Sequence, residues 1–473
     1  MSNSKIVTSI YENFYQVGEA LLRVNGNNTH SGNLSVRDPN DPDRFFMTAS
    51  GSQVGELVPR DIVPLSFTDV SWGDGRASTE SNIHRKILSI SGVNASIHCH
   101  HILSTLITFD SVDKQLFLRY LGTDDKGRDE FLFQPVDING VSIIDSVKVG
   151  YYRQPVGSLE MEERIPKYLE ELSLTLIRGH GVFARGRSLE ECLQNISVLE
   201  TCAILAINLA RRGVSLKSIQ RHILESNVSS TSIFYSLKKK KIDISDGTKV
   251  EDTSTVADFA YWCKYFYNTK IGACGTGSMS QKVTSKEMIY SPVSSIPSKK
   301  NTLISRVLTE MSEDDDIEMA LHKLIYNNTN FTTCIIASNP LATADGMAVL
   351  TEQYGIEALK GKDLGISYAR HDHPVVRPID AEAIYLNPRV GLVDITQLKN
   401  RTSENPILNM LRWHKGCCIV AGFGVIAAGD TTLEQAAHNI SSAERIGKFR
   451  IEVFMNNKIL NGPELESFEP KTI

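Results

Sequence analysis

Three histidines, His98, His100 and His101, lie within four positions of the segment SIHCHHILS, and the whole chain has only 12. Neutral imidazole is a common ligand of first-row metal ions, so this cluster indicates a candidate metal site. The segment NASIHCHHIL (94–103) predicts a β-strand. Because side chains alternate between the two faces of a strand, His98 and His100 share one face, whereas Cys99 and His101 point to the other.

Two imidazoles do not complete a metal site, and two more side chains are candidates. His180 stands in RGHGVF, where Gly179 and Gly181 let the backbone bend and other groups approach closely. Glu80, in STESNIH, is a candidate ligand or general base. Three imidazoles plus a carboxylate or a water is a common zinc arrangement when one position must stay open for substrate. The alternative is that these are unrelated polar residues near a core.

Hydrophobic periodicity predicts the elements that must position these side chains. Helices are expected over IVTSIYENFYQVGEALLRV (6–24), STESNIHRKILSI (78–90) and SLEECLQNISVLETCAILAINLARRG (188–213). The second helix should start at an N-cap of Ser78 or Thr79 with Glu80 in its first turn, and the third at Ser188. Strands are expected over RFFMTAS (44–50) and within LTLIRGHGVFARG (174–186), where two strands meet at the glycine turn.

Four motifs of this half resemble those of the class II aldolase family, in the family's order. They are SGNLSVR (31–37), TASGS (48–52), ASTESNIH (77–84) and IHCHH (97–101), the last followed much later by RGHGVFARG (178–186). The family includes fuculose-phosphate aldolase, ribulose-phosphate 4-epimerase, methylthioribulose-phosphate dehydratase and the non-enzymatic adducin head. The resemblance covers most of residues 1–212.

The resemblance implies a role for each matching residue. The family's three zinc-binding histidines match His98, His100 and His180, and its acidic residue, first a metal ligand and then an acid/base, matches Glu80. The positions that hold the substrate phosphate match Asn33, Ser50, Gly51, Ser78 and Thr79. Tyr120 aligns with the catalytic tyrosine that a neighbouring subunit contributes, and Tyr151 and Tyr152 are alternatives. His101, where relatives often have Ser or Ala, is expected at the surface or behind the ligands.

Elementary chemistry agrees with the phosphate assignment. Glycines let backbone N–H groups approach an anion, hydroxyls add donors, and a helix N-terminus carries a partial positive charge. Without the other motifs, Gly32, Asn33 and Ser35 would suit an ordinary turn equally well.

The predicted site supports chemistry next to a carbonyl. A divalent cation, expected to be Zn²⁺ with Mn or Co as alternatives, would polarise the carbonyl of a keto-sugar phosphate so that an enediolate can form. Glu80 would remove or return the proton. Because the epimerase branch typically has Asp at this position, we expect carbon–carbon cleavage or another lyase reaction.

These features predict a zinc-dependent lyase, an aldolase that cleaves a small phosphorylated ketose such as fuculose 1-phosphate. The alternatives are a ketose-phosphate dehydratase, 4-epimerase or decarboxylase on the same site, or a non-catalytic adducin-like scaffold. Retention of Glu80 and all three histidines argues against the scaffold, which would not need them.

The second half of the chain repeats the first. WHKGCCIVAGFGVIAAGDTTLEQAAHNISSAERIG echoes LSLTLIRGHGVFARGRSLEECLQNISVLETCA, GTGSMSQKV echoes HSGNLSVRD, and EMALHKLIY echoes ESNIHRKIL. Such a long repeat implies two copies of one domain. We therefore expect an α/β fold, a three-layer αβα class II aldolase-like domain with a central, mostly antiparallel sheet, present twice in tandem. The expected boundaries are 1–215 for the intact domain, 216–252 for a connector and 253–473 for the degenerate copy.

The second copy is expected to bind no metal at the corresponding position. Aligning Glu318 with Glu80 places Ile336 and Ser338 at the positions of His98 and His100. Matching GFG to GHG places Phe423 at the position of His180, and GTGS has Ser278 in place of Asn33. A lone carboxylate does not hold zinc. RHDHP (370–374) contains two other histidines, which suit an exposed loop or a relocated site.

The family resemblance implies a ring of four domains with each active site between neighbours. Two tandem chains would form a pseudo-fourfold ring as a homodimer, or a higher homo-oligomer, with the second copy supplying one wall of the site. Candidates there for a donated acid are Tyr354, Tyr368, His371 and His373.

The composition of the chain argues against three other classes: nucleic-acid-binding, secreted and membrane proteins. The chain has 473 residues, a net charge of −5 and one short basic run, Lys238–Lys241, which predicts no nucleic-acid partner. Its eight cysteines form no CxxC pair, the N-terminus lacks the apolar stretch of a signal peptide, and no run of 18 apolar residues predicts a membrane span. We expect a cytoplasmic protein with free thiols.

Overall fold

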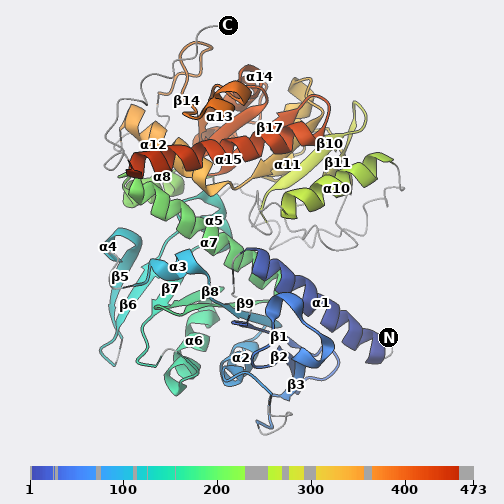
Figure 1. Ribbon diagram of the computed structural model, residues 1–473, viewed down its shortest axis with the longest axis vertical. Helices are drawn as coiled ribbons and strands as arrows, with labels where there is room; N and C mark the ends of the chain where they lie inside the picture. Colours follow the sequence, from blue (N-terminus) through green and yellow to red (C-terminus); the bar gives the residue numbers. More distant parts are fainter. Residues whose placement is uncertain are drawn as a thin grey trace. The chain divides into compact units, whose positions relative to one another are not determined.

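The computed structural model describes residues 3–24, 26, 30–70, 76–109, 114–124, 126–154, 156–228, 254–268, 276–291, 305–355 and 365–456 (Figure 1). The chain divides into two units. The first comprises Met1–Pro135 and Ile143–Ala203, and the second comprises Val136–Ser142 and Ile204–Ile473.

The first unit is built on one sheet of nine strands in the order β3-β2-β1-β4-β9-β8-β7-β6-β5. All neighbouring strands are antiparallel except β7 and β8, which are parallel. The strands are β1 (Asn33–Arg37), β2 (Arg44–Thr48), β3 (Ile62–Ser66), β4 (Ala95–Cys99), β5 (Leu118–Thr123), β6 (Asp129–Phe133), β7 (Val147–Gly150), β8 (Leu174–Ile177) and β9 (Gly181–Gly186).

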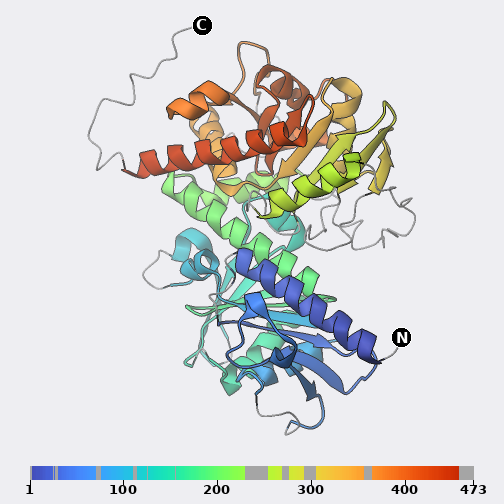
Figure 2. The ribbon, with the colours of Figure 1, turned by 45° about the vertical axis from the view of Figure 1, so that its right-hand side comes forward.

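Helices cover both faces of this sheet. They are α1 (Asn3–Arg23), α2 (Ser81–Leu88), α3 (Ile102–Leu106), α4 (Lys114–Phe117), α6 (Leu159–Glu171) and α7 (Leu189–Arg211). Helix α1 and the start of α7 run side by side, and Asn13 Nδ2 donates to Glu190 Oε1 at 2.7 Å (Figure 2). Buried Phe14, Val17 and Leu21 form the apolar stripe of α1, at the three- and four-residue spacing of an amphipathic helix.

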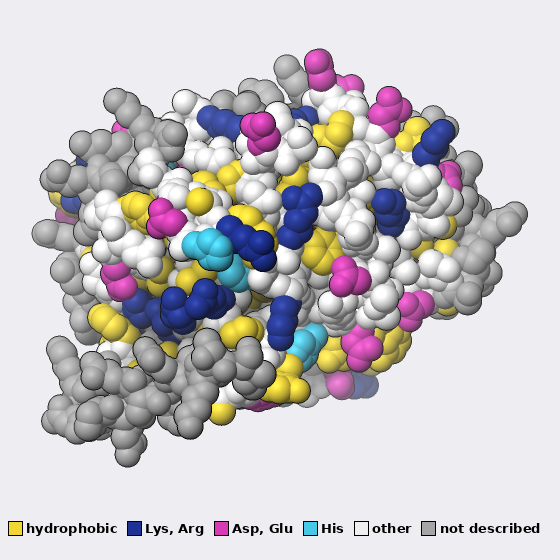
Figure 3. All heavy atoms as spheres, turned by 90° about the horizontal axis from the view of Figure 1, so that it is seen from above, with side chains coloured by type: hydrophobic (Ala, Val, Ile, Leu, Met, Phe, Trp, Pro, Cys, Tyr) yellow, Lys and Arg dark blue, Asp and Glu magenta, His cyan; other side chains and the backbone are white. Residues whose placement is uncertain are grey.

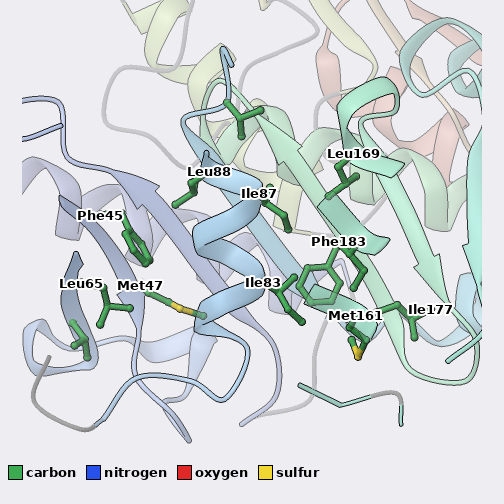
Figure 4. Close-up of a cluster of buried hydrophobic side chains, with 13 residues drawn as sticks. Phe45, Met47, Leu65, Ile83, Ile87, Leu88, Met161, Leu169, Ile177 and Phe183 are labelled. Atoms are coloured by element: carbon green, nitrogen blue, oxygen red, sulfur yellow. The ribbon is translucent and has the colours of Figure 1, made fainter. Parts of the chain in front are cut away.

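Helices α2 and α6 pack on the opposite face and enclose a hydrophobic core (Figure 4). Phe45 and Met47 are two positions apart on β2 and therefore lie on the same face of the strand. Ile83 and Ile87 are one helical turn apart on α2. Phe183 of β9 joins the same cluster. This core fixes α2 over the centre of the sheet, next to the end of β4 that carries the histidine cluster.

The second unit is built on a sheet of eight strands in the order β12-β11-β10-β13-β17-β16-β15-β14. Only β15 and β16 are parallel. The strands are β10 (Ser278–Lys282), β11 (Glu287–Ser291), β12 (Ser305–Leu308), β13 (Thr333–Ala337), β14 (Val375–Val376), β15 (Val390–Asp394), β16 (Cys417–Ala421) and β17 (Gly424–Gly429). From β12 to β15 this order follows that of β3 to β7, and the parallel pair occupies the same place.

The helices of the second unit also cover its sheet. They are α5 (Ile138–Ile143), α8 (Leu216–Glu225), α10 (Ser254–Asn268), α11 (Ile317–Asn328), α12 (Pro340–Tyr354), α13 (Ala381–Leu386), α14 (Pro406–Trp413) and α15 (Leu433–Asn456). Helices α12 and α15 pack together against β13, β16 and β17, and α14 packs against β15 and β16.

The structure differs from the expected boundaries in three places. The part of α7 from Ile204 on belongs to the second unit, although the first domain was expected to reach residue 215. The segment 136–142 belongs to the second unit, because Ile138 N–H donates to the Gly422 carbonyl at 2.8 Å and Asn139 Nδ2 donates to Ser338 Oγ at 3.0 Å. The expected connector also begins with helix α8, which Ser215 caps and whose Ile219 and Ile223 are buried. The rest of the expected connector, from residue 229 to residue 252, lies outside the described residues.

The helix that carries Glu80 starts later than expected. Helix α2 begins at Ser81, with Glu80 itself as the N-cap, so neither Ser78 nor Thr79 is the cap. The reason is a β-bridge between Ala49 and Ala77, which holds the preceding backbone extended. The expected helix over 188–213 and the two strands around the glycine turn are present as α7, β8 and β9.

Within the described part of the chain, α7 alone is long and apolar enough to cross a membrane, and 83% of its apolar window is buried inside the structure. That burial is typical of a core helix. On the face drawn in Figure 3, acidic side chains lie among and around the basic ones.

Candidate active site

The three histidines of the predicted metal site come together in the first unit. His98 lies in β4, His100 follows its end, and His180 lies in the turn between β8 and β9. Their candidate ligand atoms all lie within 4.8 Å of one another, and the Nε2 atoms of His98 and His180 are 3.3 Å apart. Two nitrogens that bind one tetrahedral zinc at about 2.0–2.1 Å lie about 3.3 Å apart, so this spacing fits a shared ion.

Glycines make this approach possible. Gly179 has a φ of +64°, a conformation that side chains rarely adopt, and so gives the turn before His180 its shape. A Cβ on Gly181 would lie well under 3.0 Å from the Cys99 carbonyl oxygen and 3.0 Å from Cδ2 of His100. Any side chain at Gly181 would therefore push β9 away from the end of β4.

The imidazoles are held in the form that binds metal. His98 is fully buried, and its Nδ1 donates to the Val182 carbonyl at 2.9 Å, which leaves the Nε2 lone pair facing the cluster. Burial, with the nearby His100 and His180, lowers the pKa of His98 well below its usual value. Burial first, and His180 second, lowers the pKa of His100 to about 4. Both rings are thus neutral at physiological pH, as metal binding requires.

Glu80 supplies the carboxylate. Its side chain is buried at the start of α2, with Oε2 at 3.6 Å from Nε2 of His98. Oε2 accepts a hydrogen bond from Asn33 Nδ2 at 2.8 Å, whereas Oε1 is buried without a hydrogen-bond partner among the described residues. Three clustered imidazoles, with this buried carboxylate beside one of them, fit a divalent cation.

Two of the residues predicted to hold phosphate, Asn33 and Ser78, lie beside this carboxylate. Asn33, on β1, pairs with His98 on β4 and donates from Nδ2 to Ser78 Oγ at 3.3 Å. The antiparallel bridge between Ala49 and Ala77 places Ser50 opposite Arg76, and the Ser50 N–H donates to the Arg76 carbonyl at 2.7 Å. Gly51 has a φ of +72° and open space where a Cβ would be, so an anion can approach its backbone.

Tyr120 is not part of its own chain's metal site. It lies 55% exposed on the edge strand β5, and four strands separate β5 from β4 in the sheet. At about 4.8 Å per strand, this separation is roughly 24 Å, which no tyrosine side chain spans. Its hydroxyl donates to Asp129 Oδ1 at 3.2 Å. A catalytic role for Tyr120 is therefore confined to a neighbouring subunit.

Tyr151, the alternative from the sequence, lies nearer the glycine turn. It follows β7, and the guanidinium of Arg178 lies 4.8 Å from the centre of its ring. Arg178 directly precedes Gly179 and His180, so this cation stands beside the predicted ligands. Sequence reasoning missed Arg178, although its position next to the GHG turn was a usable signal. Tyr152 instead packs against the hydrophobic core.

His101 is interior, and the surface position expected as one alternative is wrong. The strand ends at Cys99, and His101 becomes the N-cap of α3. Its side chain is fully buried, and Nε2 donates to the Val24 carbonyl at 3.0 Å. It therefore fixes α1 to the end of β4, away from the metal-site histidines.

Strand register in the second unit places apolar residues at the corresponding positions. Ile336 pairs with Ser278 and Ile426, as His98 pairs with Asn33 and Phe183. Ser338 Oγ donates to Thr276 Oγ1 at 3.1 Å, and Phe423 is buried in the turn between β16 and β17. Among the described residues, one group of three or more close metal-ligand side chains exists, and it lies in the first unit.

Two of the four residues proposed as donated acids are engaged inside the second unit. The hydroxyl of Tyr368 accepts from the Asp394 backbone N–H at 3.0 Å, and burial raises its pKa. His373 Nδ1 donates to the Ala369 carbonyl at 2.8 Å, and its Nε2 lies 2.8 Å from that of His414.

The comparison with known proteins agrees with this geometry. Residues 12–207 match the family model of the class II aldolase and adducin N-terminal domain. The first unit is thus similar to a class II aldolase domain. Enzymes of this superfamily, including methylthioribulose-1-phosphate dehydratase, are lyases that depend on a divalent metal, generally Zn²⁺.

Curated relatives are similar to part of this chain. Methylthioribulose-1-phosphate dehydratase of Leptospira biflexa serovar Patoc (strain Patoc 1 / Ames) is 29% identical over 185 residues, covering 36% of this chain and 82% of the relative. The enzyme of the same name from Microcystis aeruginosa is 28% identical over 192 residues, covering 40% and 86%. Among solved structures, L-fuculose-1-phosphate aldolase from Thermus thermophilus is 25% identical, covers 42% of this chain and 93% of its own, and has a TM-score of 0.36.

Proposed function

We propose that the first unit is a zinc-dependent lyase acting on a small phosphorylated ketose. The observation that carries this proposal is the convergence of His98, His100 and His180 on the buried Glu80 carboxylate, directly beside Asn33 and Ser78. A metal site and an anion cradle on adjacent strands would bind the two ends of a keto-sugar phosphate.

Each residue has a defined task in this proposal. Ser78 and the backbone of Gly51 bind the phosphate and so fix the position of the sugar carbonyl. Asn33 Nδ2 donates to both Ser78 Oγ and Glu80 Oε2 and holds these two side chains in place. The bound Zn²⁺ supplies Lewis-acid polarisation of that carbonyl. Glu80 removes the proton from the carbon next to the carbonyl, and in a dehydration it passes that proton to the hydroxyl that leaves as water.

We favour elimination of water as the reaction that follows proton removal. The two relatives that are 28–29% identical carry the name methylthioribulose-1-phosphate dehydratase, and they align over more than four-fifths of their length. In a dehydration, the hydroxyl on the carbon beyond the enediolate leaves as water. Aldol cleavage of a ketose phosphate, which the sequence motifs suggest, uses the same metal and acid/base, but a carbon–carbon bond breaks instead.

A substrate panel separates the two reactions. The protein is incubated with methylthioribulose 1-phosphate and with fuculose 1-phosphate, and the products are scored for a dehydrated diketone or for a released aldehyde. We expect metal-dependent turnover of the first class. Zinc-loaded protein that turns over no ketose phosphate would refute the lyase, and protein that holds no metal would instead support an adducin-like scaffold.

We further propose that the second unit is a degenerate repeat of the first. The strand order supports this idea, and so do matching side-chain contacts. Arg37 Nε donates to the Leu88 carbonyl at 2.9 Å, and Lys282 Nζ donates to the Tyr326 carbonyl at 3.0 Å. Glu200 accepts from the backbone N–H groups that open α3, as Glu444 does for α12.

The second unit is proposed to hold neither metal nor phosphate. Ile336 cannot ligate an ion, and Asp316 stands two residues before Glu318, where Ser78 stands relative to Glu80. An acidic side chain at that position disfavours a phosphate by charge repulsion. This leaves one active site per chain, in a cytoplasmic homodimer that forms a pseudo-fourfold ring. Full activity from a monomer in light scattering would refute the ring.

A further inference from the structure

A second buried histidine lies beside the proposed metal site without belonging to it. His84, one helical turn after Glu80 on α2, is fully buried, and its Nδ1 lies 2.7 Å from Ser35 Oγ. Burial lowers the pKa of His84 to about 3, so the ring is neutral. Its Nε2 is buried and has no hydrogen-bond partner among the described residues.

The second unit shows where this Nε2 points. His322 repeats the arrangement, with Nδ1 at 2.6 Å from Ser280 Oγ, and its Nε2 lies 2.9 Å from Ser278 Oγ. Ser278 pairs with Ile336 across the sheet as Asn33 pairs with His98, so it occupies the position of Asn33. By this correspondence, Nε2 of His84 faces the side chain of Asn33.

Within the described residues, Asn33 has an unpaired acceptor, its Oδ1, that could pair with Nε2 of His84. Its Nδ2 is committed to Glu80 Oε2 at 2.8 Å and to Ser78 Oγ at 3.3 Å, whereas its Oδ1 is buried without a partner among the described residues. If the Ser35 hydroxyl donates to Nδ1, the single proton of the neutral ring sits on Nε2. A donor and an acceptor, both buried and unpaired, then face each other.

We propose that His84 is a positioning residue, whose Nε2–H donates through one buried water to Asn33 Oδ1 and thereby holds the Asn33 amide with its Nδ2 toward Glu80. The inference rests on the proposed function, in which Glu80 binds the metal and moves the proton. Reversal of the amide would turn Oδ1 against the Glu80 carboxylate and push that carboxylate out of the metal site.

Two conservative variants test this relay, the chain of hydrogen bonds from His84 through Asn33 to Glu80. Gln places its amide near the position of the histidine Nε2, whereas Asn reaches only that of Nδ1. We expect His84→Asn to weaken Zn²⁺ binding by about 10- to 100-fold, and His84→Gln to weaken it by less than about tenfold. The Zn²⁺ dissociation constant is measured by competition with a chelator, with no substrate present, and kcat on the accepted ketose phosphate should fall in the same order.

His322→Gln and His322→Asn are the matched controls, because they disturb the same contact in the unit without metal ligands. They should leave the Zn²⁺ dissociation constant unchanged. Equal losses in the two His84 variants, or an equal loss in the His322 variants, would overturn the inference. If neither His84 variant folds, Ser35→Ala should weaken Zn²⁺ binding while Ser280→Ala does not, and an unchanged constant in Ser35→Ala would overturn it.

The experiment separates this inference from the proposed function. A wild-type protein that binds Zn²⁺ but turns over no ketose phosphate would refute the proposed reaction, and the order of the His84 variants would still decide the relay. Wild-type protein that binds no Zn²⁺ would refute both.

Discussion

Replacing Gly181 with alanine should disable the metal site with a single methyl group. The added Cβ would lie well under 3.0 Å from the Cys99 carbonyl oxygen, and thus about 1 Å inside an ordinary van der Waals contact. The obstacle is backbone in the ladder between β4 and β9, so neither partner can turn away. The strands must separate by about this distance at the point where His100 and His180 meet.

The expected effects follow from that displacement. A misplacement of about 1 Å in a reacting constellation costs on the order of 100-fold in rate, and forcing a methyl group into a packed site destabilises by about 1–3 kcal/mol. We therefore expect Gly181→Ala to lose most of its bound Zn²⁺ and about 100-fold in kcat. Metal content by mass spectrometry and thermal unfolding measure the two effects separately.

Gly424→Ala is the matched control. Gly424 stands in the second unit at the position that corresponds to Gly181, and its backbone φ is +152°. A Cβ at Gly424 would approach the Ala337 carbonyl oxygen as closely as a Cβ at Gly181 approaches that of Cys99. This variant should lower the unfolding temperature but keep the metal and kcat. Full Zn²⁺ occupancy and full activity in Gly181→Ala would refute the claim that this close approach builds the site.

Three further predictions concern other parts of the chain. His98→Ala and His180→Ala should each abolish metal binding, whereas His101→Ala, which removes a fully buried ring from the other side of the strand, should keep the metal and lower the unfolding temperature. Metal analysis that finds His101→Ala empty and His180→Ala loaded would reverse the ligand set. Burial raises the pKa of Glu318 to about 8, above about 4.3 for an unfolded chain, so its folded form holds the extra proton. The free energy of unfolding should thus fall as the pH rises from about 4.5 to 8, and Glu318→Gln should lose this part of the slope in urea unfolding; an unchanged slope would contradict the assignment. Tyr120→Phe should keep the metal but lose turnover, and mixing it with His98→Ala chains should restore part of the activity if the tyrosine acts between subunits; inactive mixtures would exclude that role.

The candidate metal site could be predicted from sequence because its signals are local. Strand alternation selects His98 and His100, and the glycine turn presents His180. All three come together in the structure. The start of α2 was predicted one or two positions early, because the pairing of Ala49 with Ala77 depends on residues 28 positions apart, which no helical pattern reveals.

Other features depend on how distant segments pack. Nothing in the sequence of the polar segment after Arg211 indicated that α8 would bury Ile219 and Ile223 in the second unit. The contact of Ser35 with His84 joins β1 to α2 across 49 positions, so the proposed relay emerges only when the sheet register is known. Motif alignment assigned Tyr120 to the site of a neighbouring subunit, and only the strand order shows that it lies on the edge strand β5, away from the metal site of its own chain.

The number of Zn²⁺ ions per chain that restores ketose-phosphate turnover tests the central claim most directly. Metal is removed with a chelator, Zn²⁺ is titrated back, and turnover is followed at each ratio. One metal-dependent site per chain predicts no activity without metal and full activity at one Zn²⁺ per chain. Activity that survives complete metal removal, or that needs two ions per chain, would contradict it.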